Sequence, residues 1–533
     1  MKVREKNKLG QYFTPAYLAD FMVGLATVGP AARVLEPSCG EGVFLDALHR
    51  QGFSDVTAVE IDPDAPAPRH AGHVQTGSFV AFAPGHCYDL IIGNPPYIRW
   101  KNLAADLRHE LSENALWNRY CNRLCDYSAI FIIKAVELLR AGGELIFITP
   151  EYWLTTTHAA TMRAYLLAHG ELAAIYQFGE APFFAGASVS TVVFKYVKRH
   201  EQRPVAVAVC ADRLKWGPAL LAALQRREPV KGVSHFVLPQ FQGAESWVLR
   251  PAGQAAAFRH YERQCAPVAA GAGTQAQLFA AAPAYACVGD VCHVANGMVS
   301  GLDAAFQLPD DLQLNAPETA RTLSVAKARH LAPFAPTGQV RYALLPPGAV
   351  GSAEELEREY PAFFAHLAPF RAALAARYAY PTPAAYWEWS FLRNHALLAR
   401  PEPRLLVPCK ERVTNKDYFR FAYAEAGTYA TQDVTALLRK PGVRESLPYI
   451  LALLNNPRVF AWLSANGIVK GGIVEFSEKP INSIPLRRID WQQAREVALH
   501  DAITRVCEQL IAGGPGADGR LAQLHGLVDE LLG

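Results

Sequence analysis

The sequence predicts an α/β fold, a doubly wound and mostly parallel sheet, with a second α+β domain after it. Short apolar runs alternate with amphipathic helical patterns over residues 33–150, as in parallel α/β sheets. At 533 residues, the chain is long enough for two or more cores. Beyond about residue 200 the alternation stops, while proline and irregular stretches become frequent.

The individual elements follow from the apolar runs and from the residues that interrupt them. Strands are expected at 33–37, 56–62, 89–95 and 144–150. Helical periodicity predicts helices at 42–50 and 126–140, the second stopped by Ala141-Gly142-Gly143. Residues 62–70 hold too many prolines for a helix, so we expect an irregular crossover there.

Composition and charge limit the class of protein. Hydrophobic residues make up 51% of the chain and charged residues 19%, which fits a globular protein and excludes a disordered one. The formal charge of +3 permits a polyanionic partner without requiring one. The ten cysteines lack the spacing of zinc sites, which indicates free thiols in a reducing cytosol and no metal site. No apolar run near the basic N-terminus is long enough to span a bilayer, so we expect a cytoplasmic protein without a membrane partner.

A change of texture divides the chain near residue 235 into a first domain, 1–235, and a second domain, 236–533. The Ala- and Gly-rich stretch 266–286 indicates an exposed loop or a mobile insertion. In the first domain, polar residues gather where strands end. Because ligands of parallel sheets bind at the carboxyl ends of the strands, these residues are candidates for a site.

The stretch "LEPSCGEGVFL" follows the first expected strand. Gly40 and Gly42 let the backbone approach a ligand between a strand and a helix N-terminus, while Glu36 places a carboxylate at the strand end. A nucleotide with a positively charged appendage suits this arrangement, and a tight structural turn is the alternative. No lysine follows the glycines, which excludes a phosphate-binding loop. Glu60, after the next strand, is suited to hold two ribose hydroxyls, unless it forms a surface salt bridge.

The stretch "YDLIIGNPPYIRW" runs an apolar strand into Asn94, Pro95, Pro96 and Tyr97. The Asn94 side chain and the main-chain carbonyls of the prolines can together accept both hydrogens of a planar exocyclic amine. Tyr97 offers a face on which a flat base can stack. A purely structural proline turn is the alternative interpretation.

In this order, "LGQYFTP", "VLEPSCGEGVFL", "VEID" and "IIGNPPY" resemble the amino-methylating DNA methyltransferases that use S-adenosylmethionine. Within them, the chain resembles the gamma group of adenine-N6 enzymes. In that group the cofactor motifs precede the catalytic motif and a target recognition domain comes last. The resemblance implies a Rossmann-like methyltransferase domain and a C-terminal DNA recognition domain.

The resemblance also assigns roles to residues. Thr14 and Glu36 contact the methionine part of the cofactor, Glu60 the ribose and Phe131 the adenine. Where the family has an aspartate or asparagine facing the adenine amine, this chain has Ser78. The full cofactor set is Thr14, Glu36, Ser38, Gly40, Gly42, Glu60, Ile61, Ser78, Phe79, Asn94 and Phe131. The expected catalytic set is Asn94, Pro95, Pro96, Tyr97 and Phe184, with Phe183 as the alternative to Phe184.

Two stretches of the second domain resemble the family's recognition domain, "HVANGMVSGLDAAFQL" at its entry and "KGGIVEFSEKPINSIPL" at its close. Between them, basic residues are interleaved with Tyr418 and Phe419, a pattern suited to phosphate contacts and groove readout. A solvated strand-turn-strand explains this pattern equally well. The expected DNA-binding residues are Arg404, Lys410, Arg412, Lys416 and Arg420.

The resemblance therefore implies a site-specific adenine-N6 methyltransferase of double-stranded DNA, which flips its target base out of the helix. Rival interpretations are cytosine-N4 methylation, methylation of RNA or of a protein glutamine, and a non-catalytic DNA-binding subunit of a defence complex. We expect a monomer with no fused nuclease, and a cognate restriction endonuclease, if there is one, on a separate chain.

Overall fold

The structure is a computed structural model that describes residues 13–66, 68–70, 73–184, 189–211, 214–266, 285–377, 384–413, 416–470, 473–513 and 516–533. The chain folds into two compact units, Met1–Ala255 and Ala256–Gly533. The first unit extends past the boundary expected near residue 235, because strand β9 (Val233–Leu238) pairs with the sheet and Trp247 packs in the first core. Most of the stretch expected to be a loop, 266–286, lies outside the described residues.

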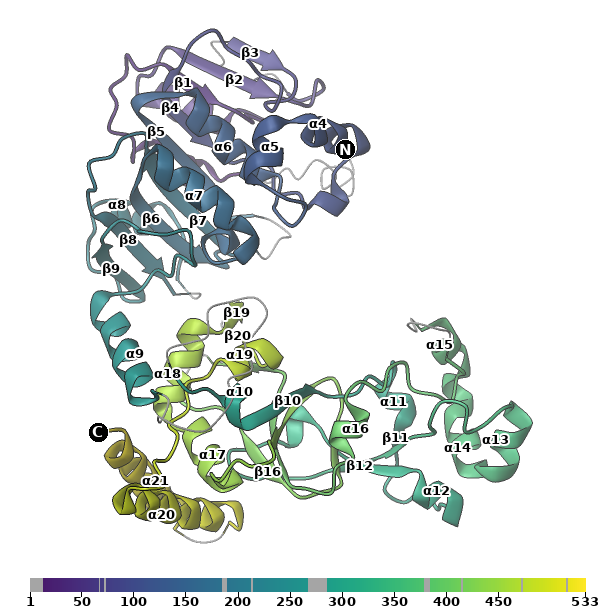
Figure 1. Cartoon of the computed structure of the whole chain (residues 1–533). Helices are drawn as coiled ribbons and strands as arrows, with labels where there is room; N and C mark the ends of the chain where they lie inside the picture. The colour runs from purple at the N-terminus through teal and green to yellow at the C-terminus, as the bar shows by residue number, and fades with distance from the viewer. Residues whose placement is uncertain are drawn as a thin grey trace. The chain divides into compact units, whose positions relative to one another are not determined.

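The first unit is built on a nine-stranded sheet of order β3-β2-β1-β4-β5-β7-β6-β8-β9 (Figure 1). Strands β1 to β5 run parallel, whereas β7 lies antiparallel between β5 and β6. The remaining strands are β1 (Val34–Glu36), β2 (Val56–Glu60), β3 (His73–Thr76), β4 (Tyr88–Gly93), β5 (Leu139–Pro150), β6 (Glu171–Gly179), β7 (Thr191–Val197) and β8 (Val205–Cys210). The strand order reverses at β1 and β4, the point where such sheets bind ligands.

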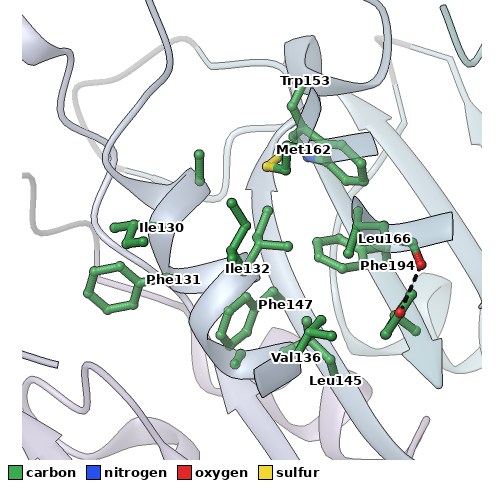
Figure 2. Close-up of a cluster of buried hydrophobic side chains, with 14 of the residues drawn as sticks. Ile130, Phe131, Ile132, Val136, Leu145, Phe147, Trp153, Met162, Leu166 and Phe194 are labelled. Carbon is green, nitrogen blue, oxygen red and sulfur yellow. Dashed lines mark hydrogen bonds between the residues drawn. The ribbon is translucent and has the colours of Figure 1, made fainter. Parts of the chain in front are cut away.

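Helices cover both faces of this sheet. One face carries α4 (Ala105–Glu113), α5 (Ala115–Tyr120), α6 (Ser128–Leu138) and α7 (Ala160–His169). The other face carries α2 (Ala16–Val23), α3 (Val43–Arg50) and α8 (Pro218–Gln225). Neighbouring residues of one strand serve opposite cores, as in β5, where Phe147 packs under α6 and Ile148 under α2 and α3. Figure 2 shows Phe147 and Leu145 among the side chains of α6 and α7.

The expected strands and helices are present, and two details are informative. Residues 61–66 and 68–70 contain no helix, which confirms the irregular crossover in the part of it that the structure describes. Helix α6 ends at Leu138, earlier than expected, and Ala141-Gly142-Gly143 lies inside β5. The reason is a register shift between β4 and β5 at Tyr88, where Gly143 lies against the Tyr88 carbonyl and leaves no room for a side chain.

The second unit combines three small sheets with helices. Their strand orders are β10-β18-β14-β16, β11-β13-β12-β17 and β15-β20-β19. The strands are β10 (Cys292–Asn296), β11 (Gln307–Leu308), β12 (Thr322–Ala326), β13 (Val340–Ala343), β14 (Arg404–Pro408), β15 (Lys410–Arg412), β16 (Ala422–Ala424), β17 (Thr428–Ala430), β18 (Val434–Arg439), β19 (Ile468–Lys470) and β20 (Ile473–Glu475).

Its helices form two groups. A core of α17 (Leu447–Leu454), α18 (Pro457–Asn466), α20 (Ala494–Ile511) and α21 (Ala517–Leu532) packs on β14 and β18. Helix α9 (Ala252–Gln264) leads into this core. The others are α10 (Val288–Val291), α11 (Asp303–Phe306), α12 (Ala316–Ala320), α13 (Ala353–Glu359), α14 (Pro361–Leu367), α15 (Arg371–Ala376), α16 (His395–Leu398) and α19 (Glu478–Asn482).

The architecture is a doubly wound, mostly parallel α/β domain with an additional α+β domain, as expected from the sequence. No helix among the described residues is long and apolar enough to cross a membrane. In the second unit, residues 286–288, just ahead of the segment expected to open the domain, bond to the segment expected to close it. Val288 donates its N–H to the Ile484 carbonyl at 2.9 Å, and Leu486 donates to Ala286 at 2.9 Å.

Candidate active site

A cavity of about 540 Å³ lies at the carboxyl ends of β1, β2 and β4, where the strand order reverses. This volume is typical of pockets for small ligands. Eight of the predicted cofactor residues line it: Thr14, Ser38, Gly40, Glu60, Ile61, Phe79, Asn94 and Phe131. Pro96 of the predicted catalytic set lines it too. The sequence therefore identified residues that the fold brings to one site.

Glu36, the last residue of β1, lies behind the lining and is fully buried. Its Oε1 accepts a 3.2 Å hydrogen bond from the Ser38 N–H, and no described group donates to its Oε2. Burial raises the pKa of Glu36 to about 8, with a smaller contribution from the nearby Glu60 carboxylate. A buried carboxyl with an unpaired oxygen beside a pocket is suited to pair with a cationic group of a ligand.

This pKa leads to a stability prediction for the protein without ligand. Glu36 binds its proton more tightly in the folded chain, at about 8, than at the ordinary value of 4.5, so the folded form is destabilised as pH rises through that window. We therefore expect the unfolding free energy of the wild type, relative to that of Glu36→Gln, to fall between those two pH values and to level off above them. Urea unfolding of both proteins from about pH 5 to about pH 9 measures this difference. A difference that stays constant with pH would contradict it.

Glu60, at the end of β2, holds the glycine loop against the second strand. Its Oε2 accepts from the Gly40 N–H at 2.7 Å and its Oε1 from the Asp62 N–H at 3.0 Å. Gly42, the residue before α3, has a φ of +87°, and a Cβ there would lie 2.5 Å from Pro68. Glycine is thus required at this turn both by conformation and by space.

Among the described residues, the charged side chains that line the cavity are all carboxylates: Glu41, Asp46, Glu60, Asp62 and Asp64. Cys39 also lines it, and burial raises the pKa of its thiol far above the usual range, so it remains neutral. A pocket of this charge repels phosphates and favours a ligand with positive charge. In the described part of the chain, no group of three metal-binding side chains is arranged to hold an ion.

The other end of the cavity is aromatic and apolar. The rings of Phe79 and Phe131 lie 4.9 Å apart, and Tyr127 meets Phe131 edge to face at 5.3 Å. Ser78 is not among the lining residues. Its hydroxyl donates to Glu110 at 2.8 Å and accepts from the Val80 N–H at 3.1 Å. The flat, apolar end is suited to a planar base, and Ser78 is connected to a carboxylate behind it.

The Asn94-Pro95-Pro96-Tyr97 turn leaves β4 at the edge of the cavity. The side-chain amide of Asn94 donates to Thr14 Oγ1 at 3.1 Å. The main-chain carbonyl of Asn94 accepts from the Ser38 hydroxyl at 3.2 Å. Thr14 and Ser38 come from segments on both sides of β1, so the two bonds fix the asparagine in orientation. The main-chain carbonyl of Asn94 is therefore occupied by Ser38, which belongs to the glycine loop after β1.

Tyr97 and Phe184 approach each other at a ring distance of 6.0 Å, but their planes make an angle of 80°. Two rings that sandwich a base must be nearly parallel, so a base between them requires one ring to turn. The Tyr97 hydroxyl donates to the Ile148 carbonyl at 2.9 Å, which anchors that ring. Phe183 packs in the core against Phe178 and Trp216, which favours Phe184 as the ring that faces Tyr97.

The five expected DNA-binding residues differ in their surroundings. Arg404 was predicted wrongly, because its side chain is fully buried and donates to the carbonyls of residues 398, 400 and 402. Lys416 and Arg420 both bind Glu411 Oε1, at 2.8 and 2.7 Å. Lys410 and Arg412 are exposed on β15, where the intervening Glu411 points inward. Of the five, Lys410 and Arg412 are therefore the two whose charged groups are exposed on a strand and are not paired with Glu411.

Sequence reasoning missed several lining residues. Asp64 lies two residues after Asp62 in the proline-rich crossover, a local signal that could have been used. Ile98, Leu107 and Tyr127 come from the long connection between β4 and β5. Nothing in their local sequence indicates that this connection folds back over the pocket.

Comparisons with known proteins agree with this architecture. Residues 70–184 match the model of the Eco57I restriction-modification methylase family. The Type II methyltransferase M.HindII of Haemophilus influenzae is 39% identical over 519 residues, covering 96% of each chain. M.HincII, a Type II methyltransferase of Haemophilus influenzae, is 38% identical over 519 residues, covering 96% of this chain and 95% of its own.

A solved structure resembles the whole chain. The Type IIL restriction-modification enzyme MmeI, determined in complex with DNA, has a TM-score of 0.60 and covers 100% of this chain and 77% of its own. At 12% identity, that likeness shows the fold alone. The relatives that share more than a third of their residues with this chain over nearly its whole length show its family. The chain belongs to the Type II methyltransferases of restriction-modification systems.

Proposed function

We propose that the chain transfers a methyl group from S-adenosylmethionine to the N6 amine of an adenine at a specific site in double-stranded DNA. One observation carries this proposal. Asn94 and Pro96 of the amine-holding turn line the same cavity as the carboxylate of Glu60 and the ring of Phe131. An amine acceptor and a pocket for a positively charged nucleoside thus share one edge of the sheet.

The residues of the cavity fit S-adenosylmethionine in charge and shape. The carboxylates at one end suit its amino group and sulfonium, with Glu36 behind them ready to lose its proton. Glu60 is placed to accept the ribose hydroxyls, and the Phe79, Phe131 and Tyr127 end is suited to the adenine. When bound, the cofactor supplies an electrophilic methyl group.

The chain's own residues supply positioning. The Asn94 side-chain oxygen and the Pro95 carbonyl accept the two hydrogens of the target amine, which aims the nitrogen lone pair at the methyl group. Tyr97, anchored on Ile148, stacks on the flipped base, and Phe184 turns to cover its other face. No residue has to remove a proton before transfer, because the amine nitrogen itself attacks; the methyl–sulfur bond would break as the nitrogen–methyl bond forms, and the methylated nitrogen would then lose one proton to solvent.

Expression in a host without DNA methylation, followed by single-molecule sequencing of its genome, tests the proposal. We expect N6-methyladenine at one short motif, absent with Asn94→Ala. Modified cytosine would move the target to cytosine-N4, because the same carbonyl pair can hold that amine. An unmodified genome, together with cofactor binding by the pure protein, would favour a non-catalytic subunit. We also propose that the protein acts as a monomer and that its cognate restriction endonuclease, if there is one, is a separate chain.

DNA contacts in the second unit give a further prediction. Lys410→Ala and Arg412→Ala should each weaken binding and lower the salt slope of log K by about 1, as expected for one lost phosphate contact. Arg404→Ala should instead destabilise the unit by about 2–5 kcal/mol, because it leaves a cavity and three unpaired carbonyls. Fluorescence anisotropy at several salt concentrations and thermal unfolding measure the two effects. A large loss of stability in Lys410→Ala would contradict this division.

A further inference from the structure

Leu124 is the most exposed large hydrophobic side chain in the described part of the chain, at 74%. It lies between α5 and α6, on the stretch that follows the Asn94-Pro95-Pro96-Tyr97 turn. Single exposed leucines are common on protein surfaces and need no function by themselves. The structure that surrounds Leu124 makes it different.

Leu124 occupies the third position of a tight turn, residues 122–125, that is fixed from several sides. The Cys125 N–H donates to the Asn122 carbonyl at 2.9 Å, and the Leu124 N–H donates to Asn122 Oδ1 at 2.9 Å. The Asn122 amide and the Cys125 thiol both contact the His158 carbonyl, at 3.2 and 3.5 Å. The turn therefore holds an apolar side chain outward in one position, at low entropic cost for binding.

The 122–125 turn is connected directly to the catalytic turn. Arg99 and Asp126 form an antiparallel bridge, and the Tyr127 N–H donates to the Ile98 carbonyl at 2.9 Å. Ile98 and Tyr127 both line the cavity. Leu124 thus lies three residues from Tyr127 in the cavity wall, next to backbone that pairs with residues 98–99, directly after Tyr97.

Several exposed cations lie near Leu124 in the chain or on the segment that pairs with its neighbour Asp126. Arg123 lies over the ring of Trp100 at 5.4 Å, and Trp100 stacks on the buried Trp117 at 5.7 Å. Arg99, Lys101 and Arg119 are exposed on the same stretch. None of these four basic side chains forms an ion pair with a described residue, and Asp126 is buried. An exposed leucine among unpaired cations fits a partner that has apolar faces and a regular array of negative charges.

We propose that Leu124 is a wedge that enters the DNA duplex beside the target base, while Arg99, Lys101, Arg119 and Arg123 hold the flanking phosphates. Apolar side chains of this size unstack neighbouring base pairs when they insert between them, which costs a few kcal/mol per step. The phosphates of the duplex would supply the negatively charged partners that these four cations lack among the described residues. This inference rests on the proposed function and identifies which surface of the first unit meets the duplex.

The test uses the full chain and a duplex that carries the motif found by genome sequencing, with 2-aminopurine at the target position. Leu124→Ala should reduce the fluorescence rise on binding and lower kcat/KM about tenfold, because an unstacking contact is lost. A duplex with an abasic site opposite the target needs less help to release its base. On that duplex, the variant should recover most of the wild-type rate, which a merely structural effect would not allow.

Matched controls come from the same unit. Val237→Ala removes another exposed apolar side chain, on β9, and should change neither the fluorescence nor the rate. Arg123→Gln should lower the salt slope by about 1, whereas Lys231→Gln should not. If Leu124→Ala behaves as wild type on both duplexes, the wedge is excluded and the surface is better suited to a protein partner. If the unmodified chain neither binds nor methylates the duplex, the proposed function fails as well.

Discussion

Asn94→Ala is expected to abolish methyl transfer while leaving cofactor binding nearly unchanged. Asn94 contributes one of the two acceptors for the target amine, and the loss of one positioned hydrogen-bonding group in an active site lowers the rate by roughly 10²–10³-fold. Alanine also removes the 3.1 Å bond to Thr14 Oγ1. It does not disturb the Ser38 contact, which uses the main-chain carbonyl at position 94. The glycine loop after β1, which includes Ser38 and Gly40, should therefore keep its conformation.

Two measurements separate these effects. Single-turnover transfer of a labelled methyl group to motif DNA reports the chemical step, and calorimetric titration with S-adenosylhomocysteine reports the cofactor site. Gln51→Ala, an exposed substitution at the end of α3, serves as the control for general damage. Near-normal transfer by Asn94→Ala would show that the amide does not hold the amine, and the proposed mechanism would then fail.

The sequence was sufficient to predict many of the residues that meet at the cavity, because its signals lie at strand ends. Glu36, Glu60 and Asn94 are distant in the chain, yet each ends or directly follows an apolar strand, and the strand order of a doubly wound sheet brings such ends together. Local spacing therefore predicts a three-dimensional site wherever backbone pairing alone fixes the geometry.

Side-chain environments beyond the strands were not predictable in this way. Arg404 reads as an exposed cation in the sequence, yet it is buried because three nearby carbonyls fall within reach of its guanidinium. In the sequence Ser78 stands as a lone hydroxyl, whereas in the structure α4 brings Glu110 to it from further along the chain. Both outcomes depend on the path that the connecting segments take, and the hydrophobic periodicity of the sequence does not predict that path.

Gly93→Ala is expected to damage both the stability of the first unit and its candidate site. Gly93 ends β4, immediately before Asn94, and a Cβ there would overlap Glu36 Oε1 and lie 3.1 Å from its Cδ and 3.4 Å from Pro37 Cδ. Glu36 is fully buried and its carboxyl group accepts the Ser38 N–H, so it has no open space to move into. The methyl group must push apart β1 and β4, the two strands whose ends form the site.

Overpacking of this kind costs about 1–3 kcal/mol, and a displacement of about 1 Å at an active site lowers activity by roughly 10²-fold. We therefore expect a lower unfolding midpoint and S-adenosylhomocysteine binding weakened by about ten- to hundredfold. Gly85→Ala, in the loop before the same strand, has no atom within 4 Å of its added Cβ and is the matched control. In a Glu36→Ala background the clash disappears, so the loss of stability caused by Gly93→Ala should shrink. An equal loss in both backgrounds would mean that the carboxyl of Glu36 is not what requires glycine at this strand end.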